Sequence, residues 1–183
     1  MKINKSTIWY LIILIVVAAV YRVSPMRAYG FAPHIPLALF GGAIIKDRKW
    51  AFALPLFSMF LSDVLYQLLY VNGLSPIQGF YSGQWVNYLV LGSVVLVGFF
   101  MKKVNVVNVL AGSLIAPTWF FLLSNFTVWF GASSIPQTWA GLLTTYELGV
   151  PFYKASIYGS LIFSTLFFGG YYLLNKKKAV AVA

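Results

Sequence analysis

Long apolar runs alternate with short polar segments along the whole chain of 183 residues. A helix that crosses the hydrocarbon core of a bilayer needs about 20 mostly apolar residues, with about 17 to 25 tolerated. We therefore expect the runs that reach or approach this length to form membrane-spanning helices. The six predicted spans cover approximately residues 7–23, 31–45, 50–71, 85–101, 104–130 and 155–174. Together they predict an all-α polytopic membrane protein with a single transmembrane domain over residues 1–183.

The segment between the fifth and sixth predicted spans has a pattern of its own. Its apolar side chains recur at helical spacing, and they are Trp139, Leu142, Leu143, Tyr146 and Val150. An apolar face of this kind is typical of a helix that lies on a membrane surface. We therefore predict a short amphipathic helix in the last outer loop, and not a seventh span.

The composition excludes a water-soluble protein. The chain is 61% hydrophobic and 9% charged, with a mean hydropathy of +0.84, whereas a soluble chain is about 25% charged. Between Val64 and Met101 there is no Asp, Glu, Lys or Arg. The sequence contains no cysteine, which excludes disulfides and thiolate metal sites.

The 13 lysines and arginines alternate between the two sides of the predicted membrane. Ten lie near the termini or after the second and fourth spans, whereas Arg22, Arg27 and Lys154 lie in the other gaps. Because basic loops stay in the cytoplasm, we expect both termini of this multi-pass membrane protein to be cytoplasmic. The net charge of +10 indicates the lipid bilayer as the partner, and not nucleic acid, because the charges punctuate apolar spans.

Asp63 is an acid deep inside the third predicted span. A carboxylate at mid-membrane costs roughly 2.5–3.5 kcal/mol on insertion scales, so it should face the bundle interior or a wet cavity. Tyr66 and Tyr70 share its helix face. Two interpretations stay open: Asp63 forms the floor of an outward-facing ligand pocket, or it is a structural carboxylate. In the second case its candidate partners are Arg22, Arg27 and His34.

Other polar and aromatic side chains are placed to complete such a pocket. Asn125 and Trp129 share an i, i+4 face near the outer end of the fifth span, where they line the pocket or bond only to neighbouring helices. We expect two segments to gate the pocket, the first outer loop and the surface helix. The candidate gating residues are Arg22, Arg27, His34, Trp139, Tyr146 and Glu147.

Signals for catalysis are weak in this sequence. It suggests no Ser–His–Asp arrangement and no glycine-rich phosphate loop, and its carboxylates are isolated, so we expect no enzyme. His34 is the single histidine, and metal sites usually draw on several ligands, so we predict no metal and no cofactor. Without a nucleotide site, active transport would need an energised partner or an ion gradient.

Several stretches together resemble a family of uncharacterised small bacterial membrane proteins. They are residues 36–43, 54–63, 124–129, 138–143 and 151–152. Members of that family are similar to the substrate-binding S components of energy-coupling factor (ECF) transporters. The resemblance implies six helices, cytoplasmic termini and an outward pocket for a vitamin or micronutrient. It also places Asp63, Asn125 and Trp129 in a recurring motif, without roles.

The resemblance bears on the first span and on partners. It favours an uncleaved first span over a signal peptide, and it implies an ATP-driven coupling module as a partner. Vitamin S components often dock through Ala-x-x-x-Ala on the first helix, but here Arg22 follows Ala18 at that spacing, so Ala38 and Gly42 would have to substitute. We therefore expect an S-component-like binding subunit for an unknown small molecule. The alternative is a structural or interaction subunit of a membrane complex without a ligand of its own.

Overall fold

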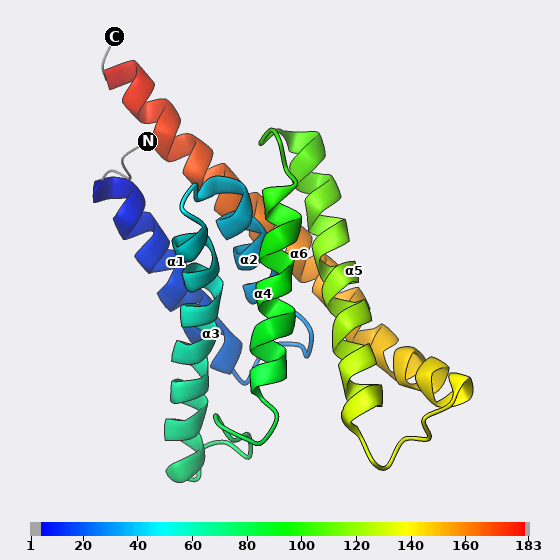
Figure 1. The fold of residues 1–183 in the computed structure, drawn as a ribbon. Helices are drawn as coiled ribbons and strands as arrows, with labels where there is room; N and C mark the ends of the chain where they lie inside the picture. The colour runs from blue at the N-terminus through cyan, green and yellow to red at the C-terminus, as the bar shows by residue number, and fades with distance from the viewer. Residues whose placement is uncertain (1–4, 182–183) are drawn as a thin grey trace.

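The computed structural model describes residues 5–181, with side chains as far as Lys176, and this part of the chain is all helical with no strand (Figure 1). Its helices are α1 (Lys5–Val23), α2 (His34–Ile44), α3 (Arg48–Val71), α4 (Trp85–Phe99), α5 (Val106–Gly131) and α6 (Trp139–Ala181).

The predicted all-α architecture is confirmed, and the first five helices begin and end within three residues of the predicted positions. Four helices are long and apolar enough to cross a membrane, namely α1, α3, α5 and α6. The helices α2 and α4 are also apolar but shorter, with 11 and 15 residues. That all six cross the membrane, and on which side the termini lie, stay predictions.

The prediction of a short amphipathic helix in the last outer loop is wrong. Its residues instead form the first part of α6, a continuous helix of 43 residues that contains Pro151. The small residues Gly141, Thr145 and Gly149 recur every fourth position and are buried, whereas Trp139 is exposed. Within the predicted apolar stripe, Leu143 and Val150 are exposed as well and Tyr146 contacts α5, so the stripe is not one continuous packed face.

Packing against α5 explains why α6 continues through its proline. The ring of Phe121 on α5 contacts Tyr146 before Pro151, at 5.5 Å between ring centroids, and Tyr153 after it, at 4.6 Å. A proline inside a helix costs about 3 kcal/mol, because it removes a hydrogen bond and crowds the preceding turn. Contacts on both sides of Pro151 offset that cost.

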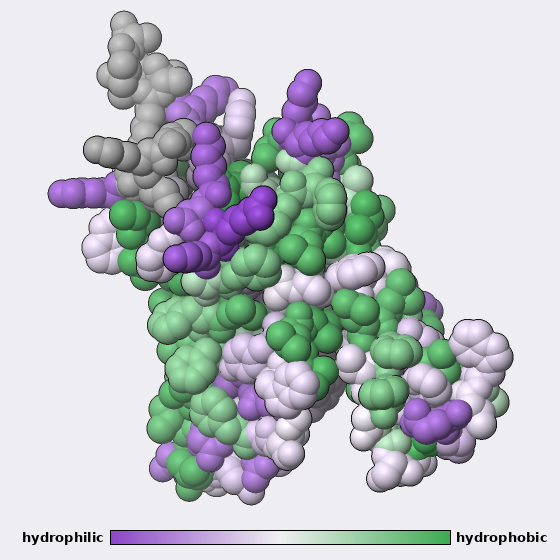
Figure 2. Space-filling model, viewed as in Figure 1, coloured by the Kyte–Doolittle hydropathy of each residue, from purple (hydrophilic) through white to green (hydrophobic). Residues whose placement is uncertain are grey.

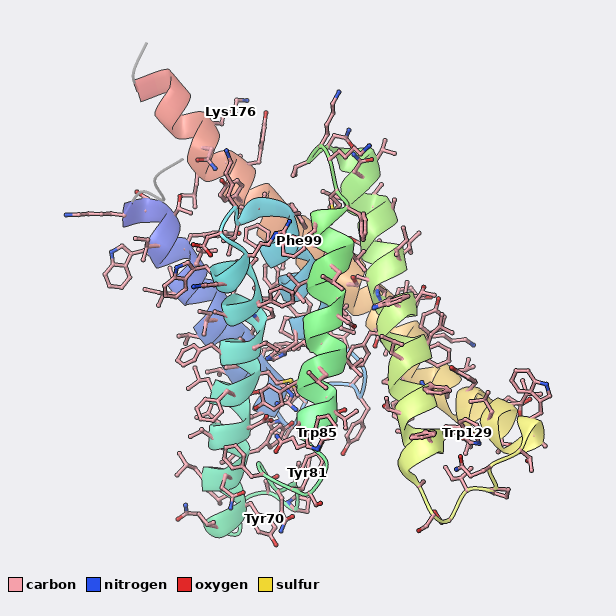
Figure 3. All side chains as sticks on the ribbon, in the orientation of Figure 1. Tyr70, Tyr81, Trp85, Phe99, Trp129 and Lys176 are labelled. Atoms are coloured by element: carbon pink, nitrogen blue, oxygen red, sulfur yellow. The ribbon has the colours of Figure 1, made fainter. Side chains whose placement is uncertain are left out.

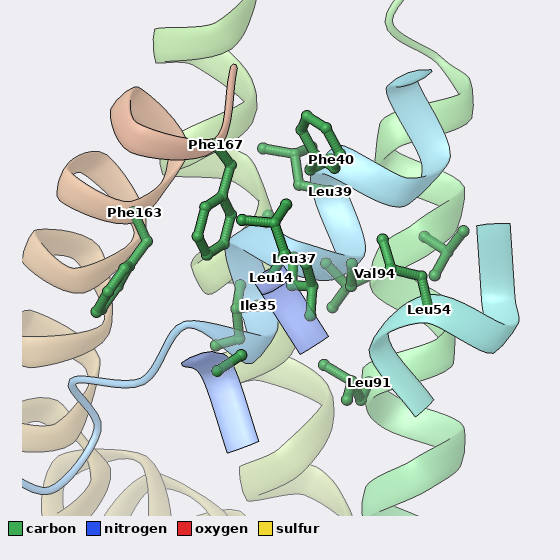
Figure 4. Close-up of a cluster of buried hydrophobic side chains, with 14 of the residues drawn as sticks. Leu14, Ile35, Leu37, Leu39, Phe40, Leu54, Leu91, Val94, Phe163 and Phe167 are labelled. Atoms are coloured by element: carbon green, nitrogen blue, oxygen red, sulfur yellow. The ribbon is translucent and has the colours of Figure 1, made fainter. Parts of the chain in front are cut away.

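The short helix α2 is the centre of the bundle. It contacts all five other helices, which form a closed ring in the order α1, α3, α4, α5, α6. Nine of its eleven residues are buried, as is typical of a helix that is hydrophobic all round. Leu37, Leu39 and Phe40 lie among side chains of the surrounding helices (Figure 4).

Glycines allow α2 and α4 to cross closely. A Cβ atom at Gly42 would overlap the carbonyl oxygen of Val95 and lie against Gly98 on α4. Small residues permit such close approach of helices in lipid. Because Ala38 and Gly42 are buried inside the bundle, they are not the substitute docking face that the resemblance would require.

The two ends of the bundle differ. At one end α1 begins and α6 ends, and hydrophilic side chains gather there (Figure 2), among them Lys176 (Figure 3). The α2–α3 turn, the start of α3 and the α4–α5 loop at this end carry Lys46, Lys49, Lys102 and Lys103, so we call it the lysine-rich end. At the opposite end, α3 and α4 stand apart from α5 and the first part of α6 (Figure 1). Figure 2 shows the surface hollowed between these two pairs. We call this end the divided end and the space between the pairs the hollow.

Candidate functional site

Both carboxylate oxygens of Asp63, on α3, have partners inside the bundle. Its side chain is almost entirely buried, and one carboxylate oxygen forms an ion pair with Arg22, in the last turn of α1. The other oxygen accepts hydrogen bonds from Gln84 Nε2 at 2.6 Å and from the hydroxyl of Tyr88 at 2.5 Å. Of the three candidate partners, Arg22 is the one that forms the ion pair. Among the described residues, Arg27 and His34 form no ion pair with this carboxylate.

The backbone end of α1 is bonded to the same cluster. The Arg22 carbonyl accepts from the hydroxyl of Tyr66 at 2.6 Å and from Arg27 Nε at 2.9 Å. Carbonyls in the last turn of a helix have no intrahelical partner, so these bonds satisfy one of them. The Arg22 guanidinium also donates to Ser62 Oγ at 2.5 Å and lies over the Tyr66 ring.

The loop between α3 and α4 folds back on α3 and brings Gln84 to Asp63. Gln67 Oε1 accepts from the backbone amides of Gly79 and Phe80, at 3.2 and 3.3 Å. A Cβ atom at position 79 would overlap the Asp63 carbonyl oxygen, so only glycine permits this approach. Gln84 Nε2 then donates to both the Gly79 carbonyl and Asp63.

The sequence analysis missed Gln84 and Tyr88 as partners of Asp63. Both are uncharged, and Gln84 lies just before the fourth span, where nothing in the local pattern relates it to α3. Their i, i+4 spacing is the signal that could have indicated one shared polar face.

His34 is a packed interior residue and does not lie on a surface gate. It is 5% exposed, at the first position of α2. Its Nε2 lies 3.4 Å from Ser58 Oγ, which donates to the Ile15 carbonyl at 3.0 Å. Its Nδ1 has no hydrogen-bond partner within the described part of the chain.

The segment 24–33, between α1 and α2, connects the two sides of the bundle. At one end, Arg27 bonds to the last turn of α1 beside Tyr66 of α3. Near the other end, Ser156 on α6 donates to the Gly30 carbonyl at 2.9 Å, and the rings of Tyr29 and Phe152 pack edge to face. This segment is therefore held between α3 and α6, midway along the bundle (Figure 1).

Asn125 and Trp129 lie on the other side of the hollow. Asn125 Nδ2 donates to the Phe121 carbonyl at 2.8 Å, and its Oδ1 lies against Gly149 of α6. Trp129 Nε1 donates to the Pro136 carbonyl at 3.0 Å. Figure 3 shows Trp129 across the divided end from Tyr70. The structure therefore separates these residues from the Asp63 cluster.

The remaining candidates occupy the surface. Tyr70, in the last turn of α3, is 38% exposed. Trp139 and Glu147 are exposed on α6, and the hydroxyl of Tyr146 donates to the Leu122 carbonyl at 2.9 Å. These three α6 residues belong to a segment packed on α5, and not to a separate surface helix above Asp63.

The bonding of Asp63 limits what its carboxylate can do. Both oxygens are occupied, so a ligand would have to displace Gln84 or Tyr88 to reach them. Arg27, by contrast, has no carboxylate within 4.0 Å in the range that the structure covers, so its positive charge is not neutralised by a neighbour. Asp63 thus positions the end of α1, while Arg27 keeps a positive charge without a carboxylate partner in the described range.

Comparisons with known proteins identify a family but no activity. No curated protein and no solved structure matches the chain. A family of unknown function (DUF6580) matches residues 2–182. Because this match covers nearly the whole sequence, the chain belongs to the family of unknown function DUF6580.

Proposed function

We propose that this protein is a binding subunit that takes a small molecule of the vitamin or micronutrient class into the hollow at its divided end. The resemblance to ECF S components suggests this role. It further suggests an orientation in the bacterial inner membrane with both termini cytoplasmic and the hollow facing outward.

The short length of α2 is the observation that carries the proposal. At 1.5 Å per residue, α2 extends only about 16 Å, whereas α3 extends about 36 Å. The helix α2 leads into Lys46 at the lysine-rich end, so it fills the centre of the bundle only there. Beyond His34, none of the helices over residues 5–181 lies between the α3–α4 pair and the α5–α6 pair.

Polar groups on both sides of the hollow can orient a ligand. Arg27 and Tyr66 lie on one side, and Asn125 and Trp129 on the other. The segment 24–33 contacts both sides and is the proposed gate, because its movement would change how α3 and α6 are held together. Release into the cell would require reorientation against an ATP-driven coupling module, since the sequence shows no nucleotide-binding motif.

A structural or interaction subunit is the second candidate. The observation that favours it is the complete bonding of Asp63, which satisfies a buried carboxylate without a ligand.

Native mass spectrometry of the gently extracted protein distinguishes these functions. We expect the wild-type protein to retain a small molecule, and the Asp63→Asn variant to retain less because the groups around Arg22 shift. Asp47→Asn is the matched control: Asp47 caps α3 at the lysine-rich end, and asparagine caps equally well. Unchanged retention in Asp63→Asn would refute a role for Asp63. A wild-type protein that carries only partner subunits would favour the structural alternative.

A further inference from the structure

A groove of about 540 Å³ lies between α1 and α3, away from the hollow. All of its lining residues are apolar; they include Ile8, Ile12 and Ile15 of α1, and Trp50, Ala53 and Phe57 of α3. The groove opens on the lateral surface of the bundle, because more than 40% of the surface of each of Ile8, Ile12 and Phe57 is exposed.

The groove is confined to the half of the bundle nearest the lysine-rich end. Its residues on α1 end at Ile15, ten residues after Lys5, which corresponds to about 15 Å along the helix. The hydrocarbon core of a bilayer is about 30 Å thick, so the groove spans about one leaflet.

Three lysines lie within about one helical turn of groove-lining residues along the chain, at the lysine-rich end. Lys5 shares the helix face of Ile8 and Ile12, Lys49 precedes Ala53 by one turn, and Lys46 follows the lining residue Ile45. All three are exposed, and none has a carboxylate within 4.0 Å among the residues described. The nearby Asp47 caps α3 by accepting from the Lys49 amide at 2.9 Å.

We propose that this groove binds an anionic phospholipid of the leaflet at the lysine-rich end, with one acyl chain between α1 and α3 and its phosphate on Lys5, Lys46 and Lys49. Basic clusters beside transmembrane helices recognise anionic headgroups in this way. The charge selects the lipid, because the apolar lining by itself does not distinguish one acyl chain from another.

The shape of the lining favours an acyl chain over a helix of another protein. Helices in membranes associate through small residues and interhelical hydrogen bonds. Here Ala53 is the one small residue among long side chains, and the lining offers no serine, threonine, asparagine or glutamine. A flexible chain can follow such a surface, whereas a helix could not approach its backbone closely.

Native mass spectrometry with defined lipids tests this site. Delipidated protein in detergent receives equal amounts of palmitoyl-oleoyl phosphatidylglycerol and phosphatidylcholine. We expect bound phosphatidylglycerol to exceed phosphatidylcholine, and the double variant Lys46→Gln/Lys49→Gln to lower that ratio about thirtyfold. The matched control, Lys102→Gln/Lys103→Gln, removes two exposed lysines from the α4–α5 loop and should leave the ratio unchanged.

Variants that fill the groove test where the acyl chain lies. Ala53→Trp should reduce binding of both lipids. If circular dichroism shows that Ala53→Trp has lost helical structure, Ile12→Trp is the second variant, because Ile12 is 41% exposed and can accept a larger side chain. An equal effect of the Lys102/Lys103 control would overturn the proposal, because it would show general attraction to the lysine-rich end. Unchanged lipid binding in a folded groove-filling variant would overturn it too. Loss of a co-purified protein from that variant, with lipid retained, would instead identify a protein-docking surface.

Discussion

At the scale of single residues, one carboxylate joins three parts of the chain that are far apart in sequence. Asp63 of α3 bonds to Arg22 at the end of α1, and to Gln84 and Tyr88 at the start of α4. A buried ion pair is stable only when its remaining polar atoms are also bonded, which these neighbours accomplish. The cluster therefore sets where α1 ends relative to α3 and α4.

Breaking this ion pair should destabilise the fold. We expect Asp63→Asn to lower the free energy of unfolding by about 3 kcal/mol, because it leaves the Arg22 guanidinium without its charged partner. Arg22→Gln should have a similar effect, and the double variant should cost less than the sum of the two. Unfolding in detergent, followed by circular dichroism, measures all three. Additive losses would contradict energetic coupling between the two side chains.

Asp47→Asn, the matched control, should change the free energy of unfolding by less than about 0.5 kcal/mol.

At the scale of helices, the length of α6 changes the architecture of the divided end. Because α6 does not stop before Pro151, its first part and α5 form one arm of the hollow. Contacts of Gly149 with Asn125, and of Tyr153 with Phe121, hold the two helices together along that arm. A separate surface helix would have left α5 without this partner.

The continuity of α6 predicts a specific distance between two spin labels. The chain has no cysteine, so Ala140→Cys with Tyr158→Cys places labels only at two exposed positions on α6. These positions are 18 residues apart, so we expect a separation near 27 Å for an unbroken helix. Leu110→Cys with Val128→Cys gives the same spacing on α5, also across one proline. A clearly shorter or broader distribution in α6 than in α5 would show a break at Pro151.

At the scale of the whole molecule, a short central helix inside a ring of longer ones produces a bundle with two different ends. The lysine-rich end is filled by α2, and the divided end is not. The distribution of lysines orients this difference relative to the membrane, since basic segments stay in the cytoplasm. This orientation is a prediction: it would turn the hollow outward and the proposed lipid groove toward the inner leaflet.

Labelling of intact cells tests that orientation. Tyr81→Cys, in the loop before α4, should react with a membrane-impermeant maleimide, because Tyr81 is 49% exposed at the divided end. Lys103→Cys, in the exposed loop between α4 and α5, should react only after the membrane is permeabilised. The opposite result, or equal labelling of both positions in intact cells, would refute an outward-facing hollow.

The sequence alone determined the first five helices and the need to keep Asp63 away from lipid. Apolar length and helix boundaries are local properties, so α1 to α5 could be placed within a few residues. The cost of a carboxylate in lipid required a buried or wet environment, and Arg22 was one of three candidate partners.

Only the tertiary structure decided which residues meet. It selected Arg22, added Gln84 and Tyr88, and placed α5, which carries Asn125 and Trp129, across the hollow from α3. It also joined the predicted surface helix to the last span, because Phe121 of α5 packs on both sides of Pro151. The physical reason is common to all of these: they depend on which helices are neighbours, and packing between segments distant in sequence leaves no signal in the local pattern of apolar and polar residues.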